Sequence, residues 1–108
     1  MSSETPHISI KITMKAVSGK EEELSDLLSG AAKLVAATEP ATLFWYATRI
    51  GTDTFTINDG FKDQSGVDAH FNGQVAAALK AKAGELVVGG WEHGVLPNVE
   101  QAAILSSI

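Results

Sequence analysis

The sequence contains no cysteine, which excludes disulfide bridges, thiolate nucleophiles and thiolate metal sites. It is also short of basic residues, because 8 Lys and Arg oppose 13 Asp and Glu and leave a formal net charge of −5. Nucleic acids and anionic membranes both attract positive surfaces, so the charge favours neither as a partner. No apolar run approaches the ~20 residues of a membrane-spanning helix. Residues 1–6 lack the features of a signal peptide, and we expect a cytoplasmic protein.

What remains is an ordinary globular composition, with 44% hydrophobic and 19% charged residues in a chain of 108. This length suits one domain with a core of its own, although a domain this small gains from pairing with a second copy. We therefore expect a single domain over residues 1–108, of which residues 1–6 form a flexible lead.

The first half of the chain predicts a strand, a helix and a second strand. Apolar and polar residues alternate over residues 7–17, which is typical of a strand with one buried face. Ser18 and Glu21 have the spacing of a capping box, so a helix is predicted to begin there. It is expected to end at Glu39, because a residue before proline avoids the helical conformation. Residues 42–50 carry three consecutive aromatic residues and predict a strand covered on both faces.

A hairpin is predicted next, with a turn at residues 51–53 and a strand over residues 54–62. Because successive side chains of a strand point to opposite faces, one face of this strand carries Phe55, Ile57, Asp59 and Phe61.

The remainder predicts a second helix, a loop and a last strand. Asp63 or Ser65 can cap the helix, which carries His70 on its inner face and is expected to break at residues 72–73 before resuming through Val88. Residues 91–97 are expected to form a loop, and residues 98–107 a strand.

The element order βαββαβ predicts an α+β fold, the ferredoxin-like sandwich. Its helices cover one face of the sheet, so the other face needs a cover of its own. A second copy of the chain is the obvious cover, and we expect a homodimer that forms a dimeric α+β barrel.

Asp59 is the leading candidate for chemistry, because a carboxylate among apolar neighbours is costly to bury without a partner. His70 on the following helix is its natural partner, and either residue can act as a general base. The alternative is a purely structural link between strand and helix.

Five further residues are candidates for substrate binding. Trp45 can form the wall of an aromatic pocket. Arg49 lies on the same face of the predicted strand and can hold an anionic oxygen. Phe61 lies on the face of Asp59, while Trp91 and His93 belong to a glycine-rich segment that can close over a pocket. The alternatives are core and dimer packing for the aromatic residues, and a solvated strand end for Arg49.

Three short motifs resemble the antibiotic biosynthesis monooxygenase family of dimeric α+β barrels. Residues 39–43, EPATL, resemble the family's Glu-Pro-Gly-x-Leu, and residues 59–63, DGFKD, resemble Glu-x-Trp-x-Asp. Residues 67–70, VDAH, resemble the Leu-x-x-His of the following helix. The likeness extends over residues 7–107. It implies the ferredoxin-like fold, a homodimer, no cofactor and oxidation of polyphenols or quinols, although the family also includes haem-degrading enzymes and an isomerase.

The sequence departs from the family where its best-described members act. Their Asn and Trp of the third strand correspond to Ile57 and Phe61, and a helix tyrosine corresponds to Val67. The predicted function is a cofactor-independent monooxygenase or isomerase acting on a small aromatic, quinol or enolisable molecule. The alternative is a non-catalytic ligand-binding or structural homodimer. His7, His70 and His93 lack metal-ligand spacing, so no metal is expected.

Overall fold

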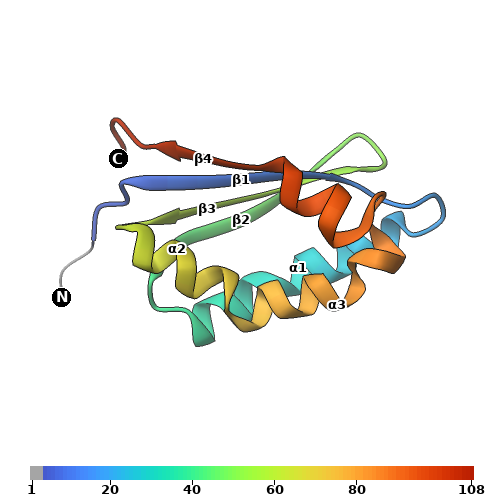
Figure 1. The fold of residues 1–108 in the computed structure, drawn as a ribbon, viewed down its shortest axis with the longest axis horizontal. Coiled ribbons are helices and arrows are strands. Elements are labelled where there is room, and N and C mark those ends of the chain that lie inside the picture. Colours follow the sequence, from blue (N-terminus) through green and yellow to red (C-terminus); the bar gives the residue numbers. More distant parts are fainter. Residues whose placement is uncertain (1–3) are drawn as a thin grey trace.

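A four-stranded antiparallel sheet carries its helices on one face in the computed structural model, which describes residues 4–108 (Figure 1). The strand order is β2-β3-β1-β4, the arrangement of a ferredoxin-like fold. The elements in chain order are β1 (Ile8–Lys15), α1 (Glu21–Thr38), β2 (Thr42–Ile50), β3 (Thr54–Phe61), α2 (Gln64–Phe71), α3 (Gln74–Leu86), the π-helical segment η1 (Gly90–Val95), the short 3-10 helix η2 (Leu96–Asn98) and β4 (Val99–Ala103).

The expected lead over residues 1–6 lies partly outside the described residues, and residues 4–6 form no helix or strand. None of the helices within residues 4–108 is long and apolar enough to cross a membrane.

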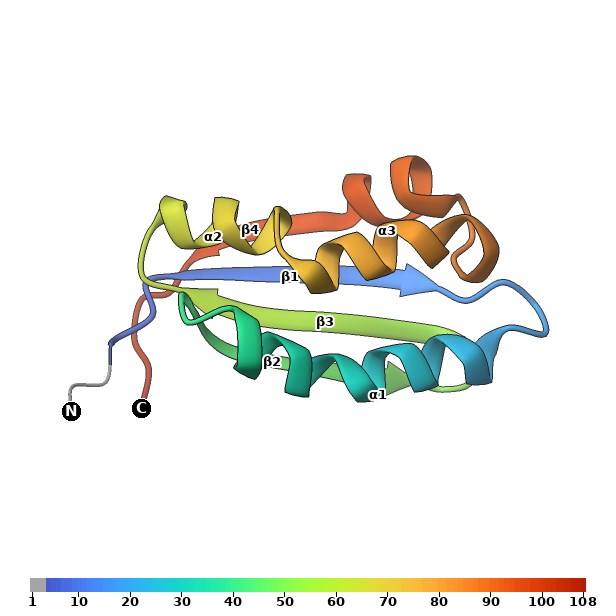
Figure 2. The same cartoon turned by 90° about the horizontal axis from the view of Figure 1, so that it is seen from below.

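The core lies between the sheet and the helices. Figure 2 shows α1 running alongside β2, while α2 and α3 run alongside β1. The predicted alternation is confirmed in β1, where the inward side chains are buried and their neighbours are more exposed. In β3 the inward side chains are buried as predicted, but Thr56 on the other face is buried as well. The largest fully buried apolar side chains are Phe55, Phe61, Ile10, Met14, Leu24, Leu86, Val87 and Val95.

The helix boundaries follow local signals, with one exception. The Asp63 side chain caps α2 by accepting a hydrogen bond from the backbone N–H of Gly66, as predicted. The break between α2 and α3 at residues 72–73 is also as predicted. The capping-box prediction at Ser18 is wrong, because α1 begins at Glu21 without a side-chain cap. Glu21 instead accepts a hydrogen bond from the backbone N–H of Gly19.

Three other expectations are wrong in detail. The segment expected to be a loop forms η1 and η2, and β4 is shorter than predicted. The strand β2 is not covered on both faces within one protomer, because Phe44 and Tyr46 are exposed on the face away from the helices. The Phe44 ring lies over Gly60, where a Cβ atom would come within 2.0 Å of the ring. The uncovered face therefore carries an aromatic surface.

Candidate functional site

His70 is held between two carboxylates in the core. Its Nδ1 atom lies 2.5 Å from Oε1 of Glu39, and its Nε2 atom lies 2.9 Å from Oδ2 of Asp59. All three side chains are buried, and Asp59 is completely inaccessible to solvent. We call this cluster the Glu39–His70–Asp59 triad. It confirms the predicted proximity of Asp59 and His70 and adds a third member.

Three elements bring the triad together. Glu39 is the residue that caps the end of α1, Asp59 lies in the second half of β3, and His70 lies in the last turn of α2. The rings of Phe61 and Phe71 pack against the imidazole, with centroids 5.4 and 5.7 Å away. The triad is thus enclosed by aromatic rings and ties two helices to the sheet.

The break between α2 and α3 makes room for the Glu39 carboxylate. A Cβ atom on Gly73 would lie 2.9 Å from Oε2 of Glu39 and 3.2 Å from the carbonyl oxygen of His70. Thr42 donates a hydrogen bond to Oε1 of Glu39. Gly73 therefore does more than end α2, because any side chain at this position would collide with the Glu39 carboxylate.

Burial and charge act in opposite directions on the triad. Burial raises the pKa of Asp59 by more than the adjacent His70 lowers it. Burial alone would lower the pKa of His70, but its contacts with Asp59 and Glu39 outweigh burial and raise it. The two contacts therefore favour the charged form of the His70 imidazole over the neutral one.

Several polar atoms around the triad lack hydrogen-bond partners. Oδ1 of Asp59 is buried without one, and Oδ2 has His70 alone within reach, as an ion-pair contact of 2.9 Å. Oε2 of Glu39 and Nε1 of Trp45 are also buried and unpartnered. Unpaired buried polar atoms are rare in proteins, and they mark this region as a candidate site.

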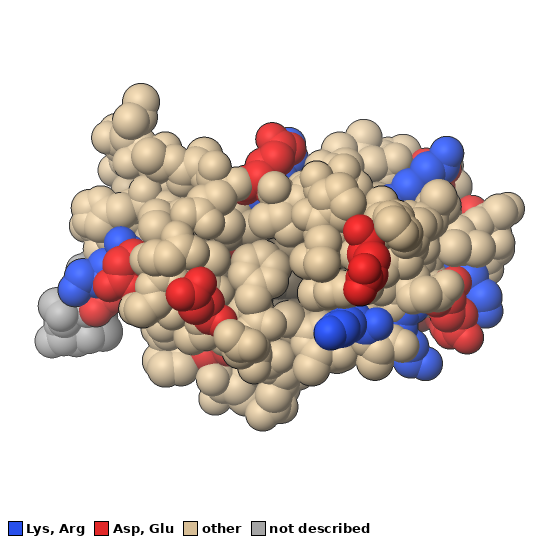
Figure 3. All heavy atoms as spheres, viewed as in Figure 1, with Lys and Arg blue, Asp and Glu red and all other residues tan. Residues whose placement is uncertain are grey.

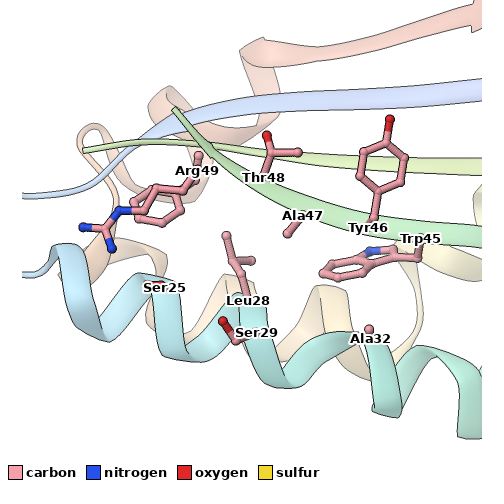
Figure 4. Close-up of a pocket in the computed structure, with 10 residues that line it drawn as sticks. Ser25, Leu28, Ser29, Ala32, Trp45, Tyr46, Ala47, Thr48 and Arg49 are labelled. Atoms are coloured by element: carbon pink, nitrogen blue, oxygen red, sulfur yellow. The ribbon is translucent and has the colours of Figure 1, made fainter. Parts of the chain in front are cut away.

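A pocket of about 280 Å³ lies between α1 and β2 (Figure 4). We call it the α1–β2 pocket. Trp45 and Leu28 project into the space between strand and helix, and Ser29 and Ala32 approach it from the helix. Its lining residues are Ser25, Leu28, Ser29, Ala32, Trp45, Tyr46, Ala47, Thr48, Arg49 and Phe55.

Trp45 connects this pocket to the triad. It lines the pocket and is also the cross-strand partner of Asp59 in the β2–β3 pairing. Side chains paired in this way project from the same face of the sheet, about 5 Å apart at their Cβ atoms. The pocket and the buried acid are therefore neighbours, although Asp59 and His70 do not line the pocket.

The other predicted binding residues do not share this pocket, apart from Arg49. Phe61 is wholly buried against His70. Trp91 lines a second pocket with residues of α2 and α3, and His93 lines a third with residues of β1. The single site expected from the sequence is thus divided among separate places. Within residues 4–108, no group of three His, Asp or Glu side chains is arranged to hold a metal ion.

Charged side chains are scattered over the face seen in Figure 3, and the described residues there form no continuous basic surface.

Glu39 is the functional candidate that sequence reasoning misses. It belongs to the EPATL motif, but the sequence pattern there indicates only the end of a helix. Its contact with His70 joins residues 31 positions apart, and no local pattern encodes such a contact.

The comparisons with known proteins give a fold and one near relative. No family model and no curated protein matches the chain. NE2512, a protein of unknown function from Nitrosomonas europaea, is 33% identical, with 95% of this chain and 93% of that chain covered and a TM-score of 0.83. A putative antibiotic biosynthesis monooxygenase from Caulobacter crescentus is 17% identical over 94% and 92% of the two chains, with a TM-score of 0.75.

A second protein of that name, from Chloroflexus aurantiacus, is 13% identical over 94% and 95% of the two chains, with a TM-score of 0.70. The ferredoxin-like α+β fold predicted from the sequence is confirmed. The resemblance to the antibiotic biosynthesis monooxygenases is supported by these shared folds.

Proposed function

Because this chain belongs to one family with NE2512 and has the fold of the antibiotic biosynthesis monooxygenases, we propose that it oxidises a small aromatic or enolisable molecule without a cofactor. The α1–β2 pocket is the substrate site, and Asp59 is the base, positioned by His70 and Glu39. The observation that carries the proposal is Trp45, which lines the pocket and is paired with Asp59 across the sheet.

The proposed chemistry begins with removal of a proton. A buried carboxylate with a raised pKa is a stronger base than an exposed one, and Oδ1 of Asp59 has no hydrogen-bond partner while Oδ2 lies beside His70. The positive charge of a protonated His70, which its contacts with the two carboxylates favour, offsets one of their two negative charges. The proton passes from an activated C–H or phenolic O–H group to Asp59 and leaves an electron-rich anion.

Molecular oxygen then reacts with that anion. For a substrate with an activated methylene group, one substrate molecule and one oxygen molecule give one ketone and one water molecule. One oxygen atom forms the new carbonyl bond, and the other leaves as water with both hydrogen atoms of the methylene group. The substrate supplies all the electrons that reduce oxygen, so the reaction needs no external reductant and no cofactor.

One observation favours a second function, the binding of a small molecule without turnover. Asp59 is completely buried and contributes nothing to the pocket lining, so a substrate must displace Trp45 to reach it. The departures from the family at Ile57, Phe61 and Val67 point the same way. In this function the triad is a structural link between α1, β3 and α2.

The protein is also proposed to act as a homodimer in the cytoplasm. The face of the sheet away from the helices exposes an aromatic surface in which the rings of Phe44 and Tyr46 stack at 6.3 Å. Tyr46 is 52% exposed and Ile50 is 58% exposed, which is a high exposure for large side chains on a sheet. Pairing of two such faces buries both aromatic surfaces.

Oxygen consumption with 1,4-dihydroxynaphthalene and with anthrone tests the enzymatic proposal. Asp59→Asn keeps the shape of the side chain but removes the base, and should lower kcat by about 100-fold or more. His93→Ala, a change of an exposed histidine, is the matched control and should leave kcat unchanged. Full turnover by folded Asp59→Asn contradicts the assignment of the base. Binding of these molecules without oxygen consumption establishes the second function instead.

A further inference from the structure

The α1–β2 pocket has one cation in its lining, and that cation is already paired. Arg49 lies at the end of the pocket nearest the start of α1 (Figure 4). Its Nη2 atom donates to Oε2 of Glu22 at 2.8 Å, and its Nη1 atom donates to Oε1 at 3.4 Å. This bidentate pair joins the two walls of the pocket, β2 and α1.

The remaining contacts hold the guanidinium in place. Its Nε and Nη2 atoms donate to the carbonyl oxygen of Thr52 at 3.1 and 2.8 Å, and its Cζ atom lies 5.1 Å from the centre of the Phe55 ring. The Arg49 side chain is 29% exposed, whereas that of Glu22 is 79% exposed. Arg49 is thus a fixed part of the wall, and Glu22 is the solvent-facing half of the pair.

The surroundings of the pair are acidic. Glu21, Glu22 and Glu23 form the first turn of α1, and hydrogen bonding to Arg49 lowers the pKa of Glu22 and keeps it ionised. Glu23 pairs with Lys20, so only Glu22 is in contact with Arg49 through its side chain. A ligand that approaches this end of the pocket meets a neutralised guanidinium and a row of carboxylates.

We propose that Glu22 is a specificity-determining residue that makes the α1–β2 pocket select uncharged aromatic molecules over aromatic anions. Glu22 occupies the hydrogen-bond donors of Arg49 that would otherwise receive a carboxylate, and its own charge repels an approaching anion. Removal of that charge turns the same pocket into an anion site with Arg49 as its receptor. This inference rests on the proposed function only in that the pocket is the ligand site.

Two probes of matched shape test the inference, uncharged 1-naphthol and anionic 1-naphthoate, with binding measured by calorimetry at pH 7.5 and low salt. The wild-type protein should bind 1-naphthol about tenfold more tightly than 1-naphthoate. Glu22→Gln should gain up to about fivefold in affinity for 1-naphthoate and leave 1-naphthol unchanged, since an exposed charge pair typically contributes no more than that. Glu22 is exposed, so the substitution leaves the fold intact.

Glu23→Gln is the matched control, because it removes the same charge from the same turn without freeing Arg49. It should leave the ratio of the two affinities unchanged. Adding Arg49→Met to Glu22→Gln should abolish the gain in 1-naphthoate binding. High salt should reduce the discrimination by the wild-type protein, because the repulsion at the exposed Glu22 is screened.

An equal shift in Glu23→Gln overturns the inference, because the effect is then one of net charge alone. A wild-type preference for 1-naphthoate, or an unchanged ratio in Glu22→Gln, overturns it as well and leaves the pocket standing as the ligand site. If no variant binds either probe, both this inference and the proposed ligand site are wrong. Asp59 takes no part in the measurement, so loss of turnover alone does not bear on the result.

Discussion

Replacement of His70 by alanine should reveal how much of the stability depends on the triad. The substitution leaves Glu39 and Asp59 buried without a counter-charge and removes a ring that packs against Phe61 and Phe71. Removal of one partner from a buried ion pair costs about 3–5 kcal/mol. Domains of this kind have a total free energy of unfolding of about 5–15 kcal/mol. At about 4 °C per kcal/mol, the melting temperature should fall by about 12–20 °C.

Urea unfolding followed by circular dichroism at pH 6.5 and pH 5.0 measures the effect. Because the folded protein has the higher pKa of His70, the stability from this proton is complete at pH 5.0 and has fallen by at most about 0.4 kcal/mol at pH 6.5, where the unfolded imidazole is about half charged. In the variant, acid protonates the buried Asp59, whose pKa is raised by burial and is no longer lowered by His70, and so removes its uncompensated charge. The destabilisation should therefore be smaller at pH 5.0 than at pH 6.5.

His93→Ala is the control, because His93 is exposed and its replacement should change the free energy of unfolding by less than about 0.5 kcal/mol. A loss below about 1 kcal/mol for His70→Ala at pH 6.5 would refute the reasoning. So would a loss that grows on acidification, since the penalty would then not come from the carboxylates.

Three further outcomes are expected. Above pH 6.5 the folded wild-type protein holds a proton on His70 that the unfolded chain releases. Its free energy of unfolding should therefore fall with rising pH, by at most about 1.4 kcal/mol per pH unit. If the free energy of unfolding of His70→Ala falls just as steeply over the same pH range, this prediction is wrong. Gly94→Ala should lower the free energy of unfolding in urea by about 1–3 kcal/mol, because its Cβ atom would meet the carbonyl oxygen of Val88. Gly84→Ala has free space around its Cβ atom and should be neutral or stabilising. Equal effects of the two substitutions would contradict the packing argument. Tyr46→Lys should shift the protein from dimer to monomer in sedimentation, and a wild-type monomer at micromolar concentration would disprove the dimer.

The sequence predicts the sheet and the face of Asp59 because a period of two needs only local information. Every second residue of β3 lies on the face that meets the helices, and this set includes Asp59. Packing of α2 on that face places His70 near Asp59. The break before α3 is predicted by Gly73 for the same local reason.

The parts that the sequence misses depend on contacts between distant residues or on side-chain volume. Glu39 reaches His70 only when α1 ends beside α2. The rings of Phe61 and Phe71 pack against His70, and the pocket lies between α1 and β2, where neither Asp59 nor His70 lines it. The positive φ angles of Gly89 and Gly90 are typical of a loop, and a single π-helical turn such as η1 gives no periodic signal.

The enclosure of the Glu39–His70–Asp59 triad has a consequence for how this chain can evolve. Loss of His70 leaves Glu39 and Asp59 buried without a counter-charge, whereas loss of one carboxylate leaves the other paired with His70. We therefore expect homologues without His70 to lack both carboxylates as well. The order of change along a lineage is thereby constrained, with the imidazole replaced only after the acids.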